Sequence, residues 1–428
     1  VSTIAVIGAG YVGLTTAACF ASMGHTVICA DIDADRIASL NEGLVPIVEA
    51  GLSELVRAGL DTGRLRFVVG AAAAVADCEF AYLCVPTPQS PDGSADLSFI
   101  RSVAAEIGPV LPTEAIVVNK STVPVGSTRV VEEVLGRDDV RVVSNPEFLR
   151  EGSAVHDFLN PDRVVIGSDD QAAAFRVASL FDSLRAQLLI TDPASAETIK
   201  YASNAFLAAK VSFVNAIANV CEAVGADVRD VLMGMSYDKR IGSEFMRPGP
   251  GFGGSCFPKD TAALIRIAAD AGYDFGLLRG VTEVNAEQFE RVVTKVESAA
   301  GGTLDGVTVA AWGLTFKART DDLRMSPSLE VIGRLLARGA RVRAFDPAIA
   351  SGSGHRPLDG IDVCADAYAP CEGAAVLVVL TEWDDFRRVD FTKVAGLLLR
   401  PLRVVDARNL LDPAELRKHG FQYTGIGR

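Results

Sequence analysis

Residues 3–13 read Thr3-Ile4-Ala5-Val6-Ile7-Gly8-Ala9-Gly10-Tyr11-Val12-Gly13 and decide the first part of the fold. A short apolar run ends in a GxGxxG turn, and a helical pattern follows over Leu14–Met23. Gly8 permits a tight turn, Gly10 lets the backbone approach a pyrophosphate, and Gly13 lets helix and strand pack closely. GxGxxG alone is a weak signal, but its place between a strand and a helix predicts a dinucleotide site.

The next predicted strand ends at Asp31, 18 residues beyond Gly13. A carboxylate there can accept hydrogen bonds from a ribose diol and would repel a 2′-phosphate, so the pattern favours NAD over NADP. The alternative for Asp31 is a simple strand-end cap. Arg36 is a candidate to flank the adenosine, and a solvated charge on a helix is an equally good interpretation.

Short β-branched runs alternate with helical patterns through residues 1–190, which predicts a parallel, doubly wound sheet. The predicted strands are Thr3–Ile7, Thr26–Ala30, Phe80–Val85, Ile116–Lys120, Arg141–Ser144 and Val164–Gly167. A long helix is predicted over Ala194–Val224, which contains no Pro or Gly, and a second helical region over about 261–298.

The alternation returns from about residue 303. It predicts strands over Val307–Trp312, Arg341–Phe345, Ala374–Leu380 and Arg403–Asp406, and a helix over Ser328–Arg338. The fold class is therefore α/β, with an N-terminal Rossmann-type doubly wound sheet, a central long-helix domain and a C-terminal Rossmann-like domain. The expected domains are 1–190 for the dinucleotide, 191–299 for the helical centre and 300–428 for the last unit.

The composition supports two or three domains, because 428 residues with 49% apolar content exceed one hydrophobic core. The net charge of −13 argues against binding nucleic acid or an anionic membrane. We expect a cytosolic protein, since no signal-peptide pattern precedes the first strand and no apolar run reaches about 18 residues. Most of the eight cysteines fit buried, reduced thiols, and their spacing predicts no metal site.

The most informative segment reads Gly251-Phe252-Gly253-Gly254-Ser255-Cys256-Phe257-Pro258-Lys259-Asp260. Gly253 and Gly254 allow a ligand or another backbone to come close to the cysteine. The cysteine lies where a loop meets a helix, and a helix N-terminus and neighbouring Lys259 would both favour thiolate. From these residues alone, a catalytic and a structural cysteine are equally good interpretations.

Six motifs together resemble the UDP-glucose/GDP-mannose dehydrogenase family and cover nearly the whole chain. They are GFGGSCFPKD (251–260), KSTVPVGST (120–128), NPEFLREG (145–152), KYASNAF (200–206), GLTFKARTDDLR (313–324) and DARNLLDP (406–413). The resemblance implies a four-electron oxidation of UDP-glucose to UDP-glucuronate with two NAD per sugar. Cys256 would capture the aldehyde and carry the thioester. GDP-mannose or a UDP-N-acetylhexosamine is the alternative substrate.

The other catalytic roles are carried over from matching motif positions. Lys200 would stabilise negative charge on the substrate oxygen, and Asn204, four residues later, shares its helical face. Asp260 with Thr122 would position the hydrolytic water, while Glu147 is a second candidate base. Four of these residues have ordinary alternatives: Lys200 as a solvated lysine, Thr122 as a turn hydroxyl, Asp260 as a helix cap and Asn204 as an amide that bonds neighbouring backbone.

The resemblance also implies residues that grip the two ligands. Cationic groups near the diphosphate would offset the overall negative charge. The cofactor-binding set is Gly8, Gly10, Tyr11, Val12, Gly13, Asp31, Arg36, Thr87, Thr122, Glu151, Lys259 and Arg324. The substrate-binding set is Glu147, Phe148, Leu149, Arg150, Glu151, Lys200, Asn204, Arg240, Phe245, Met246, Arg247, Pro248, Gly249, Gly253, Lys317 and Arg408.

Two other functions compete with this one. The first is an ordinary two-electron dehydrogenase of the related hydroxyacid type, which also uses a lysine on a long helix; the Cys256 loop speaks against it. The second is a nucleotide-sugar binding protein without catalysis, which the intact candidate catalytic set opposes. From the resemblance we expect a homodimer, or a higher homo-oligomer, built on the Ala194–Val224 helix.

Overall fold

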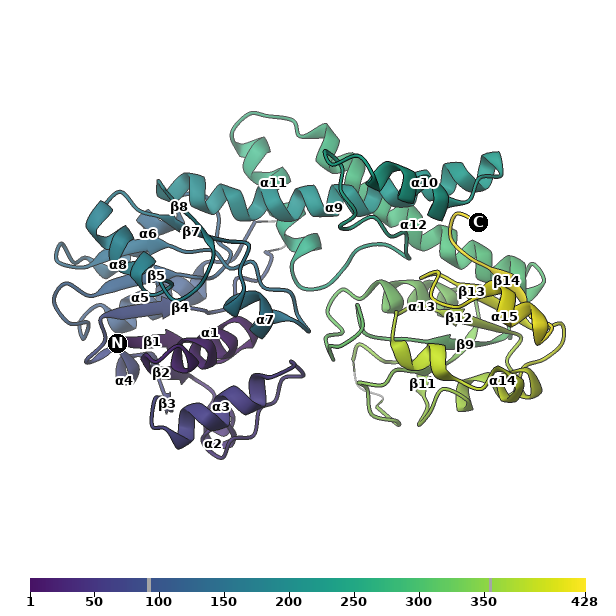
Figure 1. The fold of residues 1–428 in the computed structure, drawn as a ribbon, viewed down its shortest axis with the longest axis horizontal. Helices are drawn as coiled ribbons and strands as arrows, with labels where there is room; N and C mark the ends of the chain where they lie inside the picture. The colour runs from purple at the N-terminus through teal and green to yellow at the C-terminus, as the bar shows by residue number, and fades with distance from the viewer. Residues whose placement is uncertain (91–93, 354–355) are drawn as a thin grey trace. The chain divides into compact units, whose positions relative to one another are not determined.

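The computed structural model describes residues 1–90, 94–353 and 356–428, and Figure 1 shows the path of the chain. The chain divides into two compact units. Unit 1 comprises Val1–Ser203 and Ala262–Gly272, and unit 2 comprises Asn204–Thr261 and Tyr273–Arg428. Each unit contains its own sheet and its own hydrophobic core.

Unit 1 is built on an eight-stranded sheet. Its strands are β1 (Thr3–Ile7), β2 (Thr26–Asp31), β3 (Leu65–Val69), β4 (Phe80–Leu83), β5 (Ile116–Asn119), β6 (Arg141–Ser144), β7 (Arg163–Gly167) and β8 (Gln187–Thr191). They lie in the order β3-β2-β1-β4-β5-β6-β7-β8, and all neighbours are parallel except β6 and β7, which share one antiparallel pair. The predicted doubly wound sheet is confirmed; β3 and β8 are strands that the sequence patterns did not predict.

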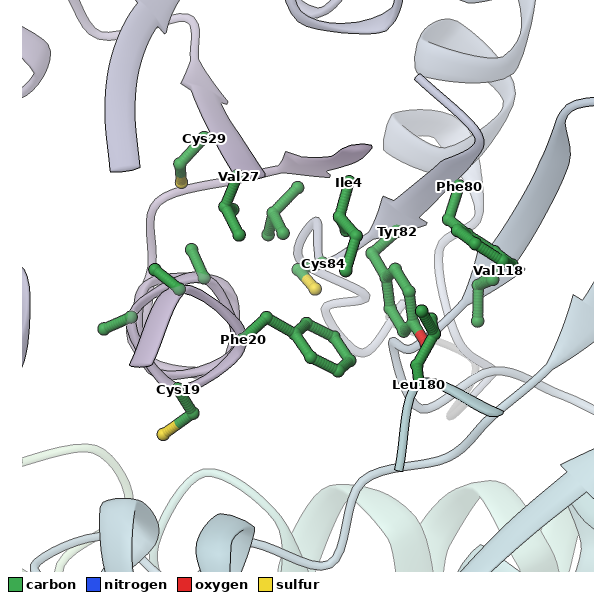
Figure 2. Close-up of a cluster of buried hydrophobic side chains, with 14 of the residues drawn as sticks. Ile4, Cys19, Phe20, Val27, Cys29, Phe80, Tyr82, Cys84, Val118 and Leu180 are labelled. Carbon is green, nitrogen blue, oxygen red and sulfur yellow. The ribbon is translucent and has the colours of Figure 1, made fainter. Parts of the chain in front are cut away.

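Helices cover both faces of this sheet. They are α1 (Tyr11–Ser22), α2 (Ala34–Asn41), α3 (Leu52–Asp61), α4 (Ala71–Val75), α5 (Ser98–Ile107), α6 (Ser127–Leu135), α7 (Ala154–Leu159) and α8 (Gln171–Ser179). Side chains of a strand alternate between faces, so Ile4 of β1 packs in one cluster and Ala5 in the other. On the first face, Phe20 of α1 points toward Tyr82 of β4, with ring centroids 5.2 Å apart (Figure 2). Burying such a ring contributes about 2 kcal/mol and fixes α1, with its glycine turn, against the strand ends.

Four further helices follow. They are α9 (Pro193–Val224), α10 (Val228–Ser236), α11 (Phe257–Asp270) and α12 (Gly276–Ala300). The long predicted helix is confirmed as α9. The helical region predicted over 261–298 is two helices, because the chain turns at Gly272, whose φ of +79° is left-handed and ends α11.

Unit 2 contains the second sheet. Its strands are β9 (Thr308–Trp312), β10 (Arg341–Phe345), β11 (Ile361–Val363), β12 (Val376–Val379), β13 (Arg403–Asp406) and β14 (Gln422–Thr424), all parallel in the order β11-β10-β9-β12-β13-β14. Its helices are α13 (Pro327–Ala337), α14 (Phe391–Leu397) and α15 (Pro413–Lys418), with 3-10 turns η1 (Ala369–Cys371) and η2 (Asp384–Arg388). Val214 of α9 and Val293 of α12 join Val309 of β9 in one buried cluster. The C-terminal Rossmann-like unit is confirmed.

Among the described residues, α9 is the one helix long and apolar enough to cross a membrane, judged by length and composition. Several of its polar side chains are nevertheless buried and hydrogen-bonded within the protein. Glu197 accepts from Thr128, Asn204 donates to Asp260, and Ser212 donates to the carbonyl of Val281. Such contacts are typical of a helix that packs against other parts of a folded domain.

Candidate active site

The glycine turn of unit 1 is tightly constrained at two positions and open at the third. Gly8 has a φ of +103°, and a Cβ there would lie 2.5 Å from the carbonyl oxygen of Cys84. A Cβ on Gly13 would lie 1.8 Å from the carbonyl oxygen of Gly8. Around Gly10, by contrast, an added Cβ meets no described atom within 4 Å. This turn has the open backbone face, in front of the N-terminus of α1, that a pyrophosphate needs.

Asp31 lies at the end of β2 beside this turn. Its Oδ2 accepts from the backbone N–H of Ala9 at 2.8 Å and from Arg36 at 3.3 Å. Oδ1 accepts from the N–H of Asp33 at 3.0 Å. The carboxylate is thus oriented by backbone, as a group that receives a ribose diol must be. These residues fit NAD.

The corresponding turn of unit 2 is closed. Gly313 follows β9 with a φ of +104°, as Gly8 follows β1. Asp346, which follows β10, is fully buried and accepts from the N–H groups of Leu314 and Thr315, the Thr315 hydroxyl and the Trp383 indole. The same fold therefore presents an available acidic group in unit 1 and a fully bonded one in unit 2.

A buried charge cluster lies in unit 1 at the ends of β5 and β6. Lys200 Nζ donates to Glu147 Oε1 at 2.8 Å, and both side chains are about 5% exposed. Burial alone would raise the pKa of Glu147, but the charge and hydrogen bond of Lys200, with the N–H of Leu149, lower it below its ordinary value. Lys120 is also buried and donates to Asn145 Oδ1 at 3.1 Å. Burial lowers the pKa of Lys120 to about 8.

The NPEFLREG segment surrounds this cluster. The Phe148 ring carries the Arg163 guanidinium 3.7 Å from its centroid and Lys200 Nζ at 5.5 Å. Arg150 is exposed and ion-paired with Asp157 at 2.6 Å. Charged partners thus contact the segment at Phe148 and Arg150.

Buried Glu49 connects the glycine turn to the same segment. Its carboxylate accepts from the Tyr11 hydroxyl and from the N–H groups of Gly152 and Ala154, at 2.7 and 2.9 Å for the latter two. A hydrogen bond also joins Thr87 to Thr122, because the Thr87 hydroxyl donates to the Thr122 carbonyl at 2.8 Å. Glu49 was not predicted from the sequence.

The cysteine loop belongs to unit 2. All eight cysteines lie in the described part of the chain; seven are buried, and Cys256 alone is partly exposed. It lies directly before α11, as predicted, and its Sγ is 3.6 Å from Ser255 Oγ. An added Cβ would meet the carbonyl oxygen of Met325 at 2.1 Å from Gly253, and the Phe316 ring at 2.9 Å from Gly254. The loop therefore requires glycine at both positions.

Asp260 stands one helical turn after Cys256 and is fully buried. Its Oδ1 accepts from Lys259 at 2.8 Å, and its Oδ2 accepts from Asn204 Nδ2 at 2.6 Å. The backbone N–H of Asp260 also donates to the Cys256 carbonyl at 2.8 Å. The predicted residues Cys256, Asn204, Lys259 and Asp260 are thus brought together in one unit.

The segments after β9 and β13 contribute the two cations predicted to hold a diphosphate, Lys317 and Arg408. Arg408 follows β13 and donates to the carbonyl of Leu380 at 2.8 Å and that of Phe316 at 3.2 Å, and it pairs with Glu382 at 3.0 Å. Lys317 Nζ lies 5.2 Å from the Phe316 ring centroid. Gly249 is adjacent, because a Cβ there would lie 3.3 Å from the Arg408 guanidinium.

Other predicted substrate and cofactor residues are more exposed. Arg240 pairs with Asp238 at 2.6 Å and is 89% exposed, and Arg324 pairs with Asp322 at 2.7 Å. Phe245 has a left-handed φ of 61°, and Met246 beside it is buried. Arg247 is exposed, and Pro248 is half-buried.

The predicted site residues fall into two groups, one in each unit. The unit 1 group is Gly8, Gly10, Tyr11, Val12, Gly13, Asp31, Arg36, Thr87, Thr122, Glu147, Phe148, Leu149, Arg150, Glu151 and Lys200. The unit 2 group is Asn204, Arg240, Phe245, Met246, Arg247, Pro248, Gly249, Gly253, Cys256, Lys259, Asp260, Lys317, Arg324 and Arg408. Lys200 and Asn204 lie four residues apart on α9, so this one helix carries members of both groups.

Comparison with known proteins decides the family. Three sequence models of the UDP-glucose/GDP-mannose dehydrogenase family match the chain: its NAD binding domain at 2–185, its central domain at 194–287 and its UDP binding domain at 310–413. The chain belongs to this family. It is an NAD-binding nucleotide-sugar dehydrogenase, and the family resemblance predicted from the motifs is confirmed. The domain boundaries expected after residues 190 and 299 remain predictions.

Relatives cover the chain almost completely. UDP-glucose 6-dehydrogenase of Pseudomonas aeruginosa is 47% identical over 99% of this chain and 97% of its own length. TuaD of Bacillus subtilis, also a UDP-glucose 6-dehydrogenase, is 44% identical over 99% of this chain and 93% of its own length. The solved UDP-glucose dehydrogenase of Pyrobaculum islandicum has a TM-score of 0.91 at 37% identity, covering 100% of this chain and 98% of that one.

Proposed function

We propose that this dehydrogenase oxidises UDP-glucose to UDP-glucuronate through a thioester on Cys256. One observation carries the proposal: Cys256 is the partly exposed thiol at the start of α11, with buried Asp260 and Asn204 beside it. The other seven cysteines are buried. The two relatives named UDP-glucose 6-dehydrogenase support the choice of sugar.

The chemistry balances over four steps. NAD, when bound, accepts the hydride in each of the two oxidations. The C6 alcohol first gives an aldehyde and a proton. The Cys256 thiolate then adds to the aldehyde carbon, forming a C–S bond, and the oxygen takes a proton to give a thiohemiacetal. A second oxidation gives the thioester and a proton, after which water adds to the carbonyl, the C–S bond breaks, and carboxylate, thiol and a proton result.

Lys200 of α9 and Asp260 of α11 supply charged groups for these steps. We assign to Lys200 the stabilisation of the substrate oxygen, because its buried ammonium is already oriented by Glu147 at 2.8 Å. Asn204 has the same role from the next turn of α9. We assign water activation to Asp260, which lies one helical turn after Cys256 and is oriented by Lys259 and Asn204, and we assign Thr122 to the same step. Glu147 is the alternative base.

The UDP moiety is proposed to bind at the C-terminal strand ends of unit 2. Arg408 and Lys317 supply positive charge there, and the Phe245–Gly249 segment lies against Arg408 at Gly249. An arginine can bind a phosphate group through two parallel hydrogen bonds, and a lysine adds a point charge. The cofactor is proposed to bind at Gly8–Gly13 and Asp31 of unit 1, where the carboxylate favours NAD over NADP.

A stoichiometric assay tests the proposal. UDP-glucose, GDP-mannose and UDP-N-acetylglucosamine are compared side by side, and we expect two NADH per UDP-glucose and little turnover of the others. Cys256→Ser should form no free acid, while Cys364→Ser, which removes a buried thiol, should retain activity. One NADH per sugar with aldehyde as the product would contradict the mechanism. A greater rate with another sugar nucleotide would contradict the substrate.

We also propose that the protein works in the cytosol as a homodimer in which α9 pairs with a second copy. Phe206, Phe213 and Val220 recur every seven residues on this helix and are 67%, 53% and 55% exposed. A stripe with this spacing is suited to helix pairing. Phe213→Asp should yield a monomer in light scattering, whereas Phe175→Asp, an exposed phenylalanine on α8, should not. Partition of the unmodified protein into lipid vesicles would instead indicate a membrane-binding helix.

A further inference from the structure

Three buried amide side chains hold the backbone of the loop that leads to Cys256. Gly249 donates its N–H to Asn215 Oδ1 at 2.8 Å, and its carbonyl accepts from Gln288 Nε2 at 2.8 Å. Phe252 donates its N–H to Asn285 Oδ1 at 2.7 Å, and its carbonyl accepts from Asn285 Nδ2 at 3.0 Å. The three amide residues are between 0% and 7% exposed. We refer to Asn215, Asn285 and Gln288 as the amide clamp.

The amide clamp supplies hydrogen-bond partners for loop backbone groups that lie outside any helix or strand. Buried backbone groups must find partners, and loops usually find them in water. Here both groups of Gly249 and both groups of Phe252 are bonded to side chains of α9 and α12. Asn219 of α9 donates to Gln288 Oε1 at 3.2 Å, which fixes the orientation of that amide. The loop is thus connected to two long helices by directional bonds.

Close packing leaves the held loop little room to shift. A Cβ on Gly251 would lie 2.6 Å from the Phe289 ring and 2.9 Å from Asn285 Oδ1. Gly253 and Gly254 are in similarly close contact with Met325 and Phe316. Cys256 follows only two residues after Gly254. Its Sγ position therefore depends on the backbone that the amide clamp fixes.

We propose that Asn215, Asn285 and Gln288 are positioning residues that align Cys256 for capture of the aldehyde. The proposal rests on the proposed thioester function. Thiol addition needs the sulfur within about 3–3.5 Å of the carbonyl carbon along a narrow direction, and a displacement of about 1 Å can cost 100-fold in rate. The first oxidation of the alcohol does not use Cys256. Loss of the amide clamp therefore impairs capture far more than the first oxidation.

The test separates these two half-reactions. Asn285→Leu keeps the side-chain shape and removes both bonds to Phe252. With UDP-glucose and NAD, we expect glucuronate formation to fall about 100-fold, while first-turnover NADH release falls less than threefold. A hydrazide trap should capture free aldehyde, and the ratio of NADH to sugar should fall from two toward one. The KM for UDP-glucose should change less than threefold.

Ser212→Ala is the matched control. Ser212 is buried and donates to the Val281 carbonyl at 2.8 Å, so it joins the same two helices without touching the loop. It should show two NADH per sugar and no trapped aldehyde. If Asn285→Leu does not fold by circular dichroism, Asn285→Ala, which also removes both bonds to Phe252, serves for the same measurement.

Equal losses in both half-reactions would overturn the amide clamp as a positioning device, and so would trapped aldehyde with Ser212→Ala. Unchanged acid formation in a folded Asn285→Leu would overturn it as well. A different result tests the proposed function. If the unmodified enzyme releases one NADH and free aldehyde, both proposals fall, whereas a dependence on Cys256 without a dependence on Asn285 removes only the amide clamp.

Discussion

At the scale of single residues, Lys120 is a buried cation whose charge changes with pH. Burial lowers its pKa from 10.5 to about 8, so between these values the unfolded chain binds one more proton than the folded one. Stability contributed by this residue therefore rises as pH increases from about 8 to 10.5. The difference corresponds to about 3 kcal/mol at about 1.4 kcal/mol per pKa unit. Lys120→Met should lack this rise, as measured by urea unfolding at pH 8, 9 and 10.

Lys239→Met is the control for Lys120, because Lys239 is exposed on the surface of unit 2. It should follow the unmodified protein across the same pH range. Parallel curves for all three proteins would show that Lys120 has no unusual linkage to folding. Lys120 begins the KSTVPVGST motif, but its burial could not be predicted, because burial of a lysine cannot be read from a linear pattern.

At the scale of elements, the Gly8–Gly13 turn contains one glycine that folding requires, Gly13, and one that ligand binding requires, Gly10. Gly13→Ala should cost about 3 kcal/mol of stability, because its Cβ would meet the Gly8 carbonyl at 1.8 Å. Gly10→Ala should change stability by less than about 0.5 kcal/mol, because the added Cβ has open space. Its NAD affinity should still fall about tenfold or more, since the methyl group occupies the pyrophosphate approach. Urea unfolding and titration calorimetry with NAD check the pair; equal NAD affinity in Gly10→Ala would contradict the assigned site.

The sequence predicted the interior strands of both sheets and none of the four edges. β3, β8, β11 and β14 each have one neighbouring strand. β8 is largely exposed along its length, and β11 and β14 contain three residues each. Strands buried on both faces form continuous apolar runs, whereas edge strands have a weaker apolar signal. Apolar patterns therefore identified the interior strands, which form the core, and missed the edge strands.

At the scale of the whole molecule, the sequence predicted only those site residues that lie within the motifs. Cys256, Lys200, Asn204 and Asp260 lie in motifs of seven and ten residues, and the order of the motifs identifies the family. Asn215, Asn285 and Gln288 lie outside those motifs, and their contacts join positions 33 to 39 residues apart. Nothing in local spacing reveals such bonds, because an isolated polar residue in a helix is usually solvated. Support of the site comes from tertiary structure that the motifs do not encode.

The two units, each with its own core, predict separate responses to the two ligands. NAD is proposed to contact the glycine turn of unit 1, and UDP the strand ends of unit 2. A ligand at 100 times its Kd stabilises the unit that binds it by about 2.7 kcal/mol, which slows amide hydrogen exchange through opening of that unit about 100-fold. We expect NAD alone to protect β1 and β4, and UDP alone to protect β9 and β12. Asp31→Ala should abolish the first effect and Arg408→Met the second. Equal protection of both sheets by either ligand would mean instead that α9 makes the two units open as one, since this helix carries residues of each.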